Sequence, residues 1–181
     1  MFGLNDAEST NALDLLKRDH KEVDDLFQQF EDAKEDGNRK LRGEIAAQIC
    51  AALTVHATME EEIFYPALRK NATDVKDLVD EAAVEHQTLK DIIERLQAAP
   101  TSDPLFDAGV KVLSEYVKHH VKEEENEIFP KAKSSDVDLD RLGAKMAQRK
   151  DELSAGMASA PAGGRGKSRA SSNGKGTSAR R

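Results

Sequence analysis

The chain has 181 residues, of which 34% are charged and 4% aromatic, with a net charge of −7 and no tryptophan. This length suits one domain with a hydrophobic core, and the abundance of Leu, Ala, Glu and Lys favours helices over sheets. A single cysteine, Cys50, excludes an internal disulfide, no apolar run is long enough to cross a bilayer, and the first residues lack a secretory signal pattern. We therefore expect a soluble cytoplasmic protein.

The first two predicted helices each carry a histidine on the apolar face. The first begins near residues 9–11, where Ser, Thr and Asn are good capping residues, and ends near Lys34. Its apolar residues recur every three or four positions, and His20 occupies one of these positions. The second helix is expected over about 39–69, with His56 and Glu60 on its inward face and a kink at Pro66.

Two further helices are predicted over about 73–98 and 102–130, with Pro104 in the first turn of the latter. His86 lies on the apolar face of the former, and both His120 and Glu124 lie on the apolar face of the latter. All four helices thus place a histidine among core positions.

A shorter fifth helix is expected over about 138–152, and a basic tail follows it. Residues 155–181 contain six basic residues and no acid, which leaves a net charge of −13 on residues 1–154. Because the tail consists mainly of Gly, Ser, Ala, Arg and Lys, we expect it to be disordered. Without aromatic residues for base stacking, its charge gives only a screened attraction, so nucleic-acid binding is not expected.

Four long helices with short connections predict an all-α fold, an antiparallel up-down-up-down four-helix bundle. The expected organisation is an N-terminal extension at 1–9, the bundle at 10–133, the short additional helix at 134–154 and the tail at 155–181.

An internal repeat links the histidines. The segment from His56 to Pro66 has Glu four and five residues after the histidine, an aromatic residue at nine and Pro at ten, and the segment from His120 to Pro130 repeats this pattern. Residues four apart on a helix lie one above the other, so each histidine can share a ligand with the first Glu of its segment. The chain therefore consists of two tandem helix pairs, each contributing His and then His-x3-Glu.

This repeat predicts a metal centre. A buried carboxylate is costly unless it is paired or binds a cation, and two inward glutamates would repel each other. Neutral imidazoles and carboxylates are good ligands for iron, manganese or zinc. Any one of these histidines alone is more often an ordinary core residue, but the complete set exceeds one tetrahedral zinc and suits two bridged ions. The predicted metal ligands are His20, His56, Glu60, His86, His120 and Glu124.

Two pairs of acids lie next to these ligands. Glu61 and Glu125 are expected on a solvated face, with metal ligation as the alternative. Asp19 and Glu85 are candidates for outer partners of the histidines, although adjacent residues on a helix do not face each other.

Three other residues have weaker claims on the site. His119 points about 100° away from its neighbour on a helix and is expected to be exposed. Tyr65 and Tyr116 are expected in ordinary core packing, with lining of the metal pocket as the alternative.

The pattern H…HxxxE…H…HxxxE, with its EExxxYP and EExxxFP endings, resembles the hemerythrin family in its bacterial HHE cation-binding form, over roughly residues 10–132. Ferritin-like bundles instead use Glu-x-x-His. The resemblance implies a four-helix bundle with a non-haem di-iron centre, in which two carboxylates bridge two iron ions and histidines complete their coordination. It also implies binding of O2, NO or peroxide, in sensing, detoxification or iron handling.

One position departs from the oxygen-carrying hemerythrins, which have a further histidine on the third helix. Four residues either side of His86 this chain has Ala82 and Lys90. An outside ligand would therefore find an open position, and reversible oxygen transport is not expected. Weak peroxidase, catalase-like or NO-related activity is the enzymatic interpretation. The alternative is a non-catalytic metal-storage or structural module with a partner-binding tail; the oligomeric state stays open.

Overall fold

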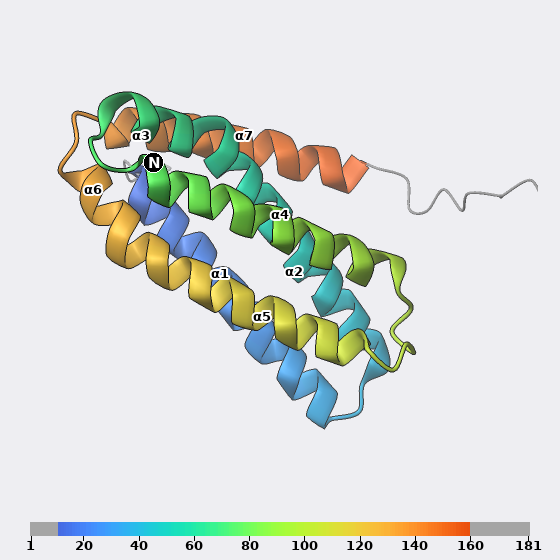
Figure 1. Ribbon diagram of the computed structural model, residues 1–181. Helices are drawn as coiled ribbons and strands as arrows, with labels where there is room; N and C mark the ends of the chain where they lie inside the picture. Colours follow the sequence, from blue (N-terminus) through green and yellow to red (C-terminus); the bar gives the residue numbers. More distant parts are fainter. Residues whose placement is uncertain (1–10, 160–181) are drawn as a thin grey trace, which may run out of the picture.

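The computed structural model describes residues 11–159, and these residues form helices without any strand. Four antiparallel rods make an up-down-up-down bundle, and a fifth helix lies along one side of it (Figure 1). The predicted fold class is confirmed. No helix in the described part of the chain is both long and apolar enough to span a membrane.

The first two rods are joined by a tight turn with a cap on either side. Helix α1 runs over Ala12–Glu35, and the Asn11 side chain at its start accepts hydrogen bonds from the N–H groups of Leu13 and Asp14. Helix α2 covers Arg39–Met59 and is capped by Asn38 in the same manner. Gly37 between them adopts φ +68°, a conformation that costs a glycine little.

The second rod continues past α2 through a π-helical segment, η1 (Glu60–Phe64), into α3 (Tyr65–Asn71). The Tyr65 N–H bonds to the Glu60 carbonyl, five residues back. Pro66 explains this wider turn, because it has no N–H to donate and its ring would clash with the carbonyl four residues earlier. The predicted kink is thus a π-helical turn that begins at Glu60.

The third and fourth rods repeat this design. Helix α4 covers Lys76–Ala98, and α5 (Phe106–Glu123) leads through η2 (Glu124–Ile128) into α6 (Phe129–Lys133). Pro130 follows η2 as Pro66 follows η1. Helices α4 and α5 both begin later than predicted. Asp74, before α4, has φ 55°, which lies outside the helical range, and Pro104 precedes the first turn of α5.

Helix α7 spans Leu139–Ser159 and packs against α1 and α2. It extends past the predicted end at Glu152 and includes residues 155–159, which we expected in the tail. Leu153 packs against the core there, which favours continuing the helix. The rest of the predicted tail lies outside the described residues.

The core consists of two apolar clusters along the bundle axis. One lies at the end formed by α3, α6 and α7, and the other at the end with the α1–α2 and α4–α5 connections. The second cluster contains Cys50, and burial raises the pKa of its thiol to about 11. This fits its expected role as a core residue.

Candidate metal centre

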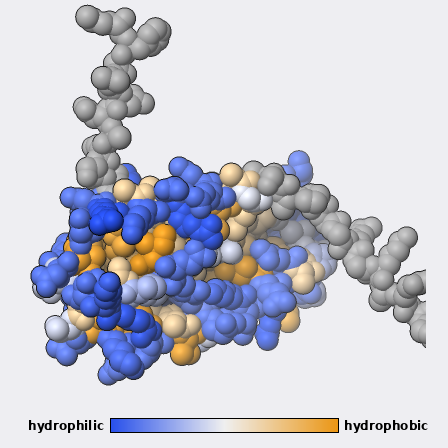
Figure 2. Space-filling view, turned by 90° about the horizontal axis from the view of Figure 1, so that it is seen from above, coloured by the Kyte–Doolittle hydropathy of each residue, from blue (hydrophilic) through white to orange (hydrophobic). Residues whose placement is uncertain are grey.

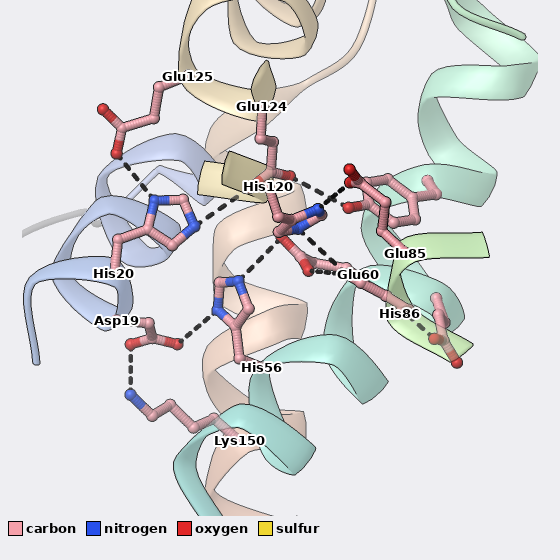
Figure 3. Close-up of polar contacts among 12 residues, drawn as sticks. Asp19, His20, His56, Glu60, Glu85, His86, His120, Glu124, Glu125 and Lys150 are labelled. Atoms are coloured by element: carbon pink, nitrogen blue, oxygen red, sulfur yellow. Dashed lines mark hydrogen bonds and ion pairs between the residues drawn. The ribbon is translucent and has the colours of Figure 1, made fainter. Parts of the chain in front are cut away.

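The structure brings all six predicted ligands together inside the bundle (Figure 3). Each of α1, α2, α4 and α5 contributes one histidine, and η1 and η2 contribute the two glutamates. All six are buried, and both glutamates are 0% exposed. They form two donor sets, in each of which the ligand atoms lie within 4.8 Å of one another: His20, His56, Glu60 and Glu124, and Glu60, His86 and His120.

Glu60 is common to both sets because its two oxygens face different histidines. Its Oε1 lies 3.1 Å from His56 Nε2, and its Oε2 lies 3.3 Å from His86 Nε2. A carboxylate with one oxygen toward each donor set has the arrangement needed to bridge two cations. Figure 3 shows this central position of Glu60.

The donor atoms fit cations better than they fit one another. His20 Nε2 lies 3.1 Å from Glu124 Oε2, yet neither atom has a partner in hydrogen-bond geometry among the described residues, and the same holds for His56 Nε2 and both oxygens of Glu60. Leaving buried polar groups unsatisfied costs about 1–3 kcal/mol each. The Nε2 atoms of His86 and His120 are 3.2 Å apart, near the roughly 3 Å expected for neighbouring nitrogens about 2.1 Å from one ion.

The pKa shifts show how unfavourable the site is without a cation. Burial alone would lower the pKa of His56, but Glu60, Asp19 and Glu124 together raise it to about 10. Burial raises the pKa of Glu60, but His56 and His86 bring it well below its usual value. Burial and the neighbouring Glu60 both raise the pKa of Glu124. Protons would therefore balance the buried carboxylates, and bound cations would replace those protons.

Asp19 and Glu85 are outer partners, but of a different histidine from the one adjacent in sequence. Glu85 Oε2 lies 2.8 Å from Nδ1 of His120, and Asp19 Oδ2 lies 3.6 Å from Nδ1 of His56. Each acid reaches across to the next helix of its own pair. As expected, neither acid faces the histidine next to it in sequence, and each faces the histidine of the neighbouring helix instead.

Glu61 and Glu125 hold the other two histidines. The Nδ1 atom of His20 is 2.8 Å from Glu125, and that of His86 is 3.0 Å from Glu61. These contacts cross between the two helix pairs. The two glutamates are thus neither purely solvated nor in the donor sets, and they orient the Nε2 atom of each ring toward the centre.

Two lysines secure the outer carboxylates. Lys90 Nζ donates to both oxygens of Glu61 at 2.6 Å, and Lys150 Nζ of α7 donates to Asp19 Oδ1 at 2.5 Å. No sequence pattern indicated Lys150, because this residue lies outside the repeat. His119 is exposed as predicted, and its ring lies 3.5 Å from Glu85.

The aromatic position of the repeat differs between its two copies. Tyr65 is buried, with its ring 5.6 Å from that of His86, and its hydroxyl donates a long hydrogen bond of 3.4 Å to Glu124. Phe129 stacks against His20 at 6.0 Å without any polar group to offer. Tyr65 therefore both packs in the core and lines the site. Tyr116 does neither, since it is 42% exposed.

The second donor set has one donor fewer than the first. One turn before His86 the chain has the buried Ala82, where the first half has the larger Leu16 before His20. A cavity of about 20 Å³ also adjoins all four imidazoles. That volume accommodates roughly one water-sized molecule.

Comparison with known proteins gives consistent matches. Residues 11–132 match the hemerythrin HHE cation-binding domain. A protein of Mycobacterium tuberculosis described as uncharacterized is 26% identical over 146 residues, which are 79% of this chain and 87% of that protein. A DNA nickase of Nostoc sp. is 32% identical over 127 residues, which are 69% of this chain. The chain spans only about a third of that relative, 34% of its length.

A solved structure supports the same assignment. The crystal structure of a hemerythrin HHE cation-binding domain-containing protein from Mycobacterium kansasii superposes with a TM-score of 0.69 and is 26% identical, covering 81% of this chain and 88% of that one. The family match at residues 11–132 extends over the bundle that carries the histidines and glutamates. This chain therefore belongs to the hemerythrin HHE cation-binding domain family.

Proposed function

We propose that this protein binds two iron ions in a non-haem, carboxylate-bridged centre, and that the centre interacts with O2, NO or peroxide in sensing, detoxification or iron handling. The observation that carries the proposal is Glu60, whose two oxygens face two different donor sets while neither oxygen has a hydrogen-bond partner among the described residues. Two ions explain both features.

In this proposal the two ions share one ligand, Glu60, and their other ligands are separate. His20, His56 and Glu124 would hold the first ion, and His86 and His120 the second, with Glu60 shared. Imidazole and carboxylate donors suit iron. Bound iron would supply redox and Lewis-acid chemistry.

The chain's own residues would orient the ligands and exclude bulk water. Glu125, Glu61 and Glu85 hold three of the rings through their Nδ1 atoms, and Asp19 lies 3.6 Å from the Nδ1 atom of the fourth, so that each Nε2 atom faces the centre. The two apolar clusters shield the site at either end of the bundle. The small cavity that adjoins all four imidazoles is where a small outside ligand would bind.

Purification from iron-replete cells, followed by metal analysis and a visible spectrum, tests the proposal. We expect about two irons per chain and a spectrum that changes when azide, NO or peroxide is added. One zinc per chain at full occupancy, without iron, would overturn it. Two irons with no response to any of these ligands would instead favour the storage or structural module. The nickase name comes from a much longer protein, so we do not extend that activity to this chain.

A further inference from the structure

Helix α7 reaches the metal centre through a single chain of polar contacts (Figure 3). Lys150 Nζ lies 2.5 Å from Asp19 Oδ1, and the other oxygen of Asp19 lies 3.6 Å from His56 Nδ1. Asp19 is only 5% exposed, so this contact lies at the edge of the protein interior. Helix α7 also lies beyond residues 11–132, the part matched by the family domain.

In the second half, no polar contact from α7 reaches the corresponding carboxylate within residues 11–159. Glu85, the counterpart of Asp19, lies 2.8 Å from His120 Nδ1, and its other oxygen faces His119 at 3.5 Å. The His119 side chain is 60% exposed, so water surrounds most of it. Asp19 thus pairs with a lysine of α7, and Glu85 with a solvated imidazole. The lysine contact of the second donor set lies instead at Glu61, which accepts from Lys90 of α4.

The carboxylate of Asp19 and the ammonium of Lys150 act on His56 in opposite directions. A carboxylate that accepts the Nδ1 proton makes Nε2 a stronger metal ligand. An ammonium on that carboxylate competes for its charge. Asp19 lies 3.6 Å from its ring, beyond hydrogen-bond distance, whereas Glu85 lies 2.8 Å from its ring. With Lys150 in place, His56 should therefore be a weaker electron donor than it would be beside Asp19 alone. A ligand that donates less electron density, with a positive charge nearby, favours the reduced state of the bound ion, because that state carries less positive charge.

We infer that Lys150 is a positioning residue, which acts through Asp19 on His56 and gives the ion held by His20 and His56 a higher reduction potential than it would otherwise have. The inference rests on the proposed di-iron function. It gives α7 a specific role, which is to place a positive charge beside the first metal position, as Lys90 of α4 places one beside Glu61 and the second.

The test measures the two one-electron reduction potentials of the full-length, iron-loaded protein by spectroelectrochemistry, with Mössbauer spectra to separate the two irons. Lys150→Met should lower one potential and leave the other unchanged, and Lys150→Arg should restore it. In an Asp19→Asn background, Lys150→Met should have no further effect. Two unchanged potentials, or equal shifts in both, would refute the role of Lys150.

Arg149→Met is the matched control, because Arg149 also joins α7 to the bundle through two hydrogen bonds to Glu62 at 2.7 and 3.0 Å. If this variant shifts the same potential, docking of α7 rather than the Lys150 charge is responsible, and the inference fails. Should Lys150→Met lose its metal, Lys150→Gln takes its place, and loss of metal there too would assign Lys150 to structure alone. Wild-type protein without two irons would contradict the proposed function instead.

Discussion

The two halves of the bundle share one design but differ in its details. Each half supplies a histidine, a His-x3-Glu segment and a π-helical turn, η1 or η2, that begins at the glutamate. In each half an acid on the first helix of the pair reaches the histidine of the second. The shared elements are those that a pair of equivalent metal positions requires.

The differences all lie around this shared set. One turn before its first histidine, the first half has Leu16 and the second half has Ala82. At the aromatic position of the repeat, the first half has Tyr65 and the second half has Phe129. Asp19 pairs with a lysine of α7, whereas its counterpart pairs with an exposed histidine. The repeat thus explains the number of candidate ligands, and its exceptions give the two donor sets different surroundings.

The largest effect should come from the one residue that both donor sets share. Glu60→Ala should lose both metal ions, whereas Glu124→Ala should keep the ion of the second set. Each ion lost removes about 2.7 kcal/mol of stabilisation if it is present at 100 times its dissociation constant. Metal analysis and thermal unfolding of the two variants check this. Equal metal content in both variants would contradict the sharing of Glu60.

Removing one histidine from either half should have a smaller and more local effect. His56→Ala should lose the first ion and His120→Ala the second, and both should also lower the melting temperature, because buried carboxylates lose compensation. We expect about one remaining ion per chain in each variant. Full metal content in either variant would show that its histidine is not a ligand.

Giving the second donor set a fourth donor, as the first set has, should weaken the binding of outside ligands. Ala82→His, one turn before His86, should add a fourth donor to the second set and reduce azide binding. Because Ala82 is buried, the larger ring should cost about 1–3 kcal/mol of stability. Azide titrations and melting curves measure both effects. Leu16→His is the control, which should destabilise the protein without changing azide binding.

The apoprotein should become less stable as the pH rises from 6.5 toward 10. The pKa of His56 is about 10 in the folded chain against 6.5 as its ordinary value, so the folded state holds a proton that the unfolded state releases across this window. The raised pKa values of His20 and His86 act in the same direction. Melting curves of metal-free protein at several pH values test this. His56→Ala should flatten the dependence, and a rise of stability with pH would contradict it.

The sequence predicted the bundle and all six candidate ligands because a repeat with helical spacing constrains both. It could not predict contacts between helices, which depend on how the rods are rotated and packed. The pairing of Asp19 with His56 and that of Lys150 with Asp19 are of this kind. The π-helical turns were equally hidden, since a proline in a helix predicts a disruption but not its form.

The smallest effect should come from removing the hydroxyl that only one half possesses. Tyr65→Phe makes this position match Phe129, and it removes a hydrogen bond of 3.4 Å to Glu124. Because that bond is long and the ring still packs in the core, we expect a loss of only about 0.5–1.5 kcal/mol and unchanged metal content. Tyr116→Phe, at an exposed site, is the control and should change neither quantity. If Tyr65→Phe instead loses one ion, the hydroxyl orients Glu124 as a ligand, and the two halves differ more deeply than their donor sets indicate.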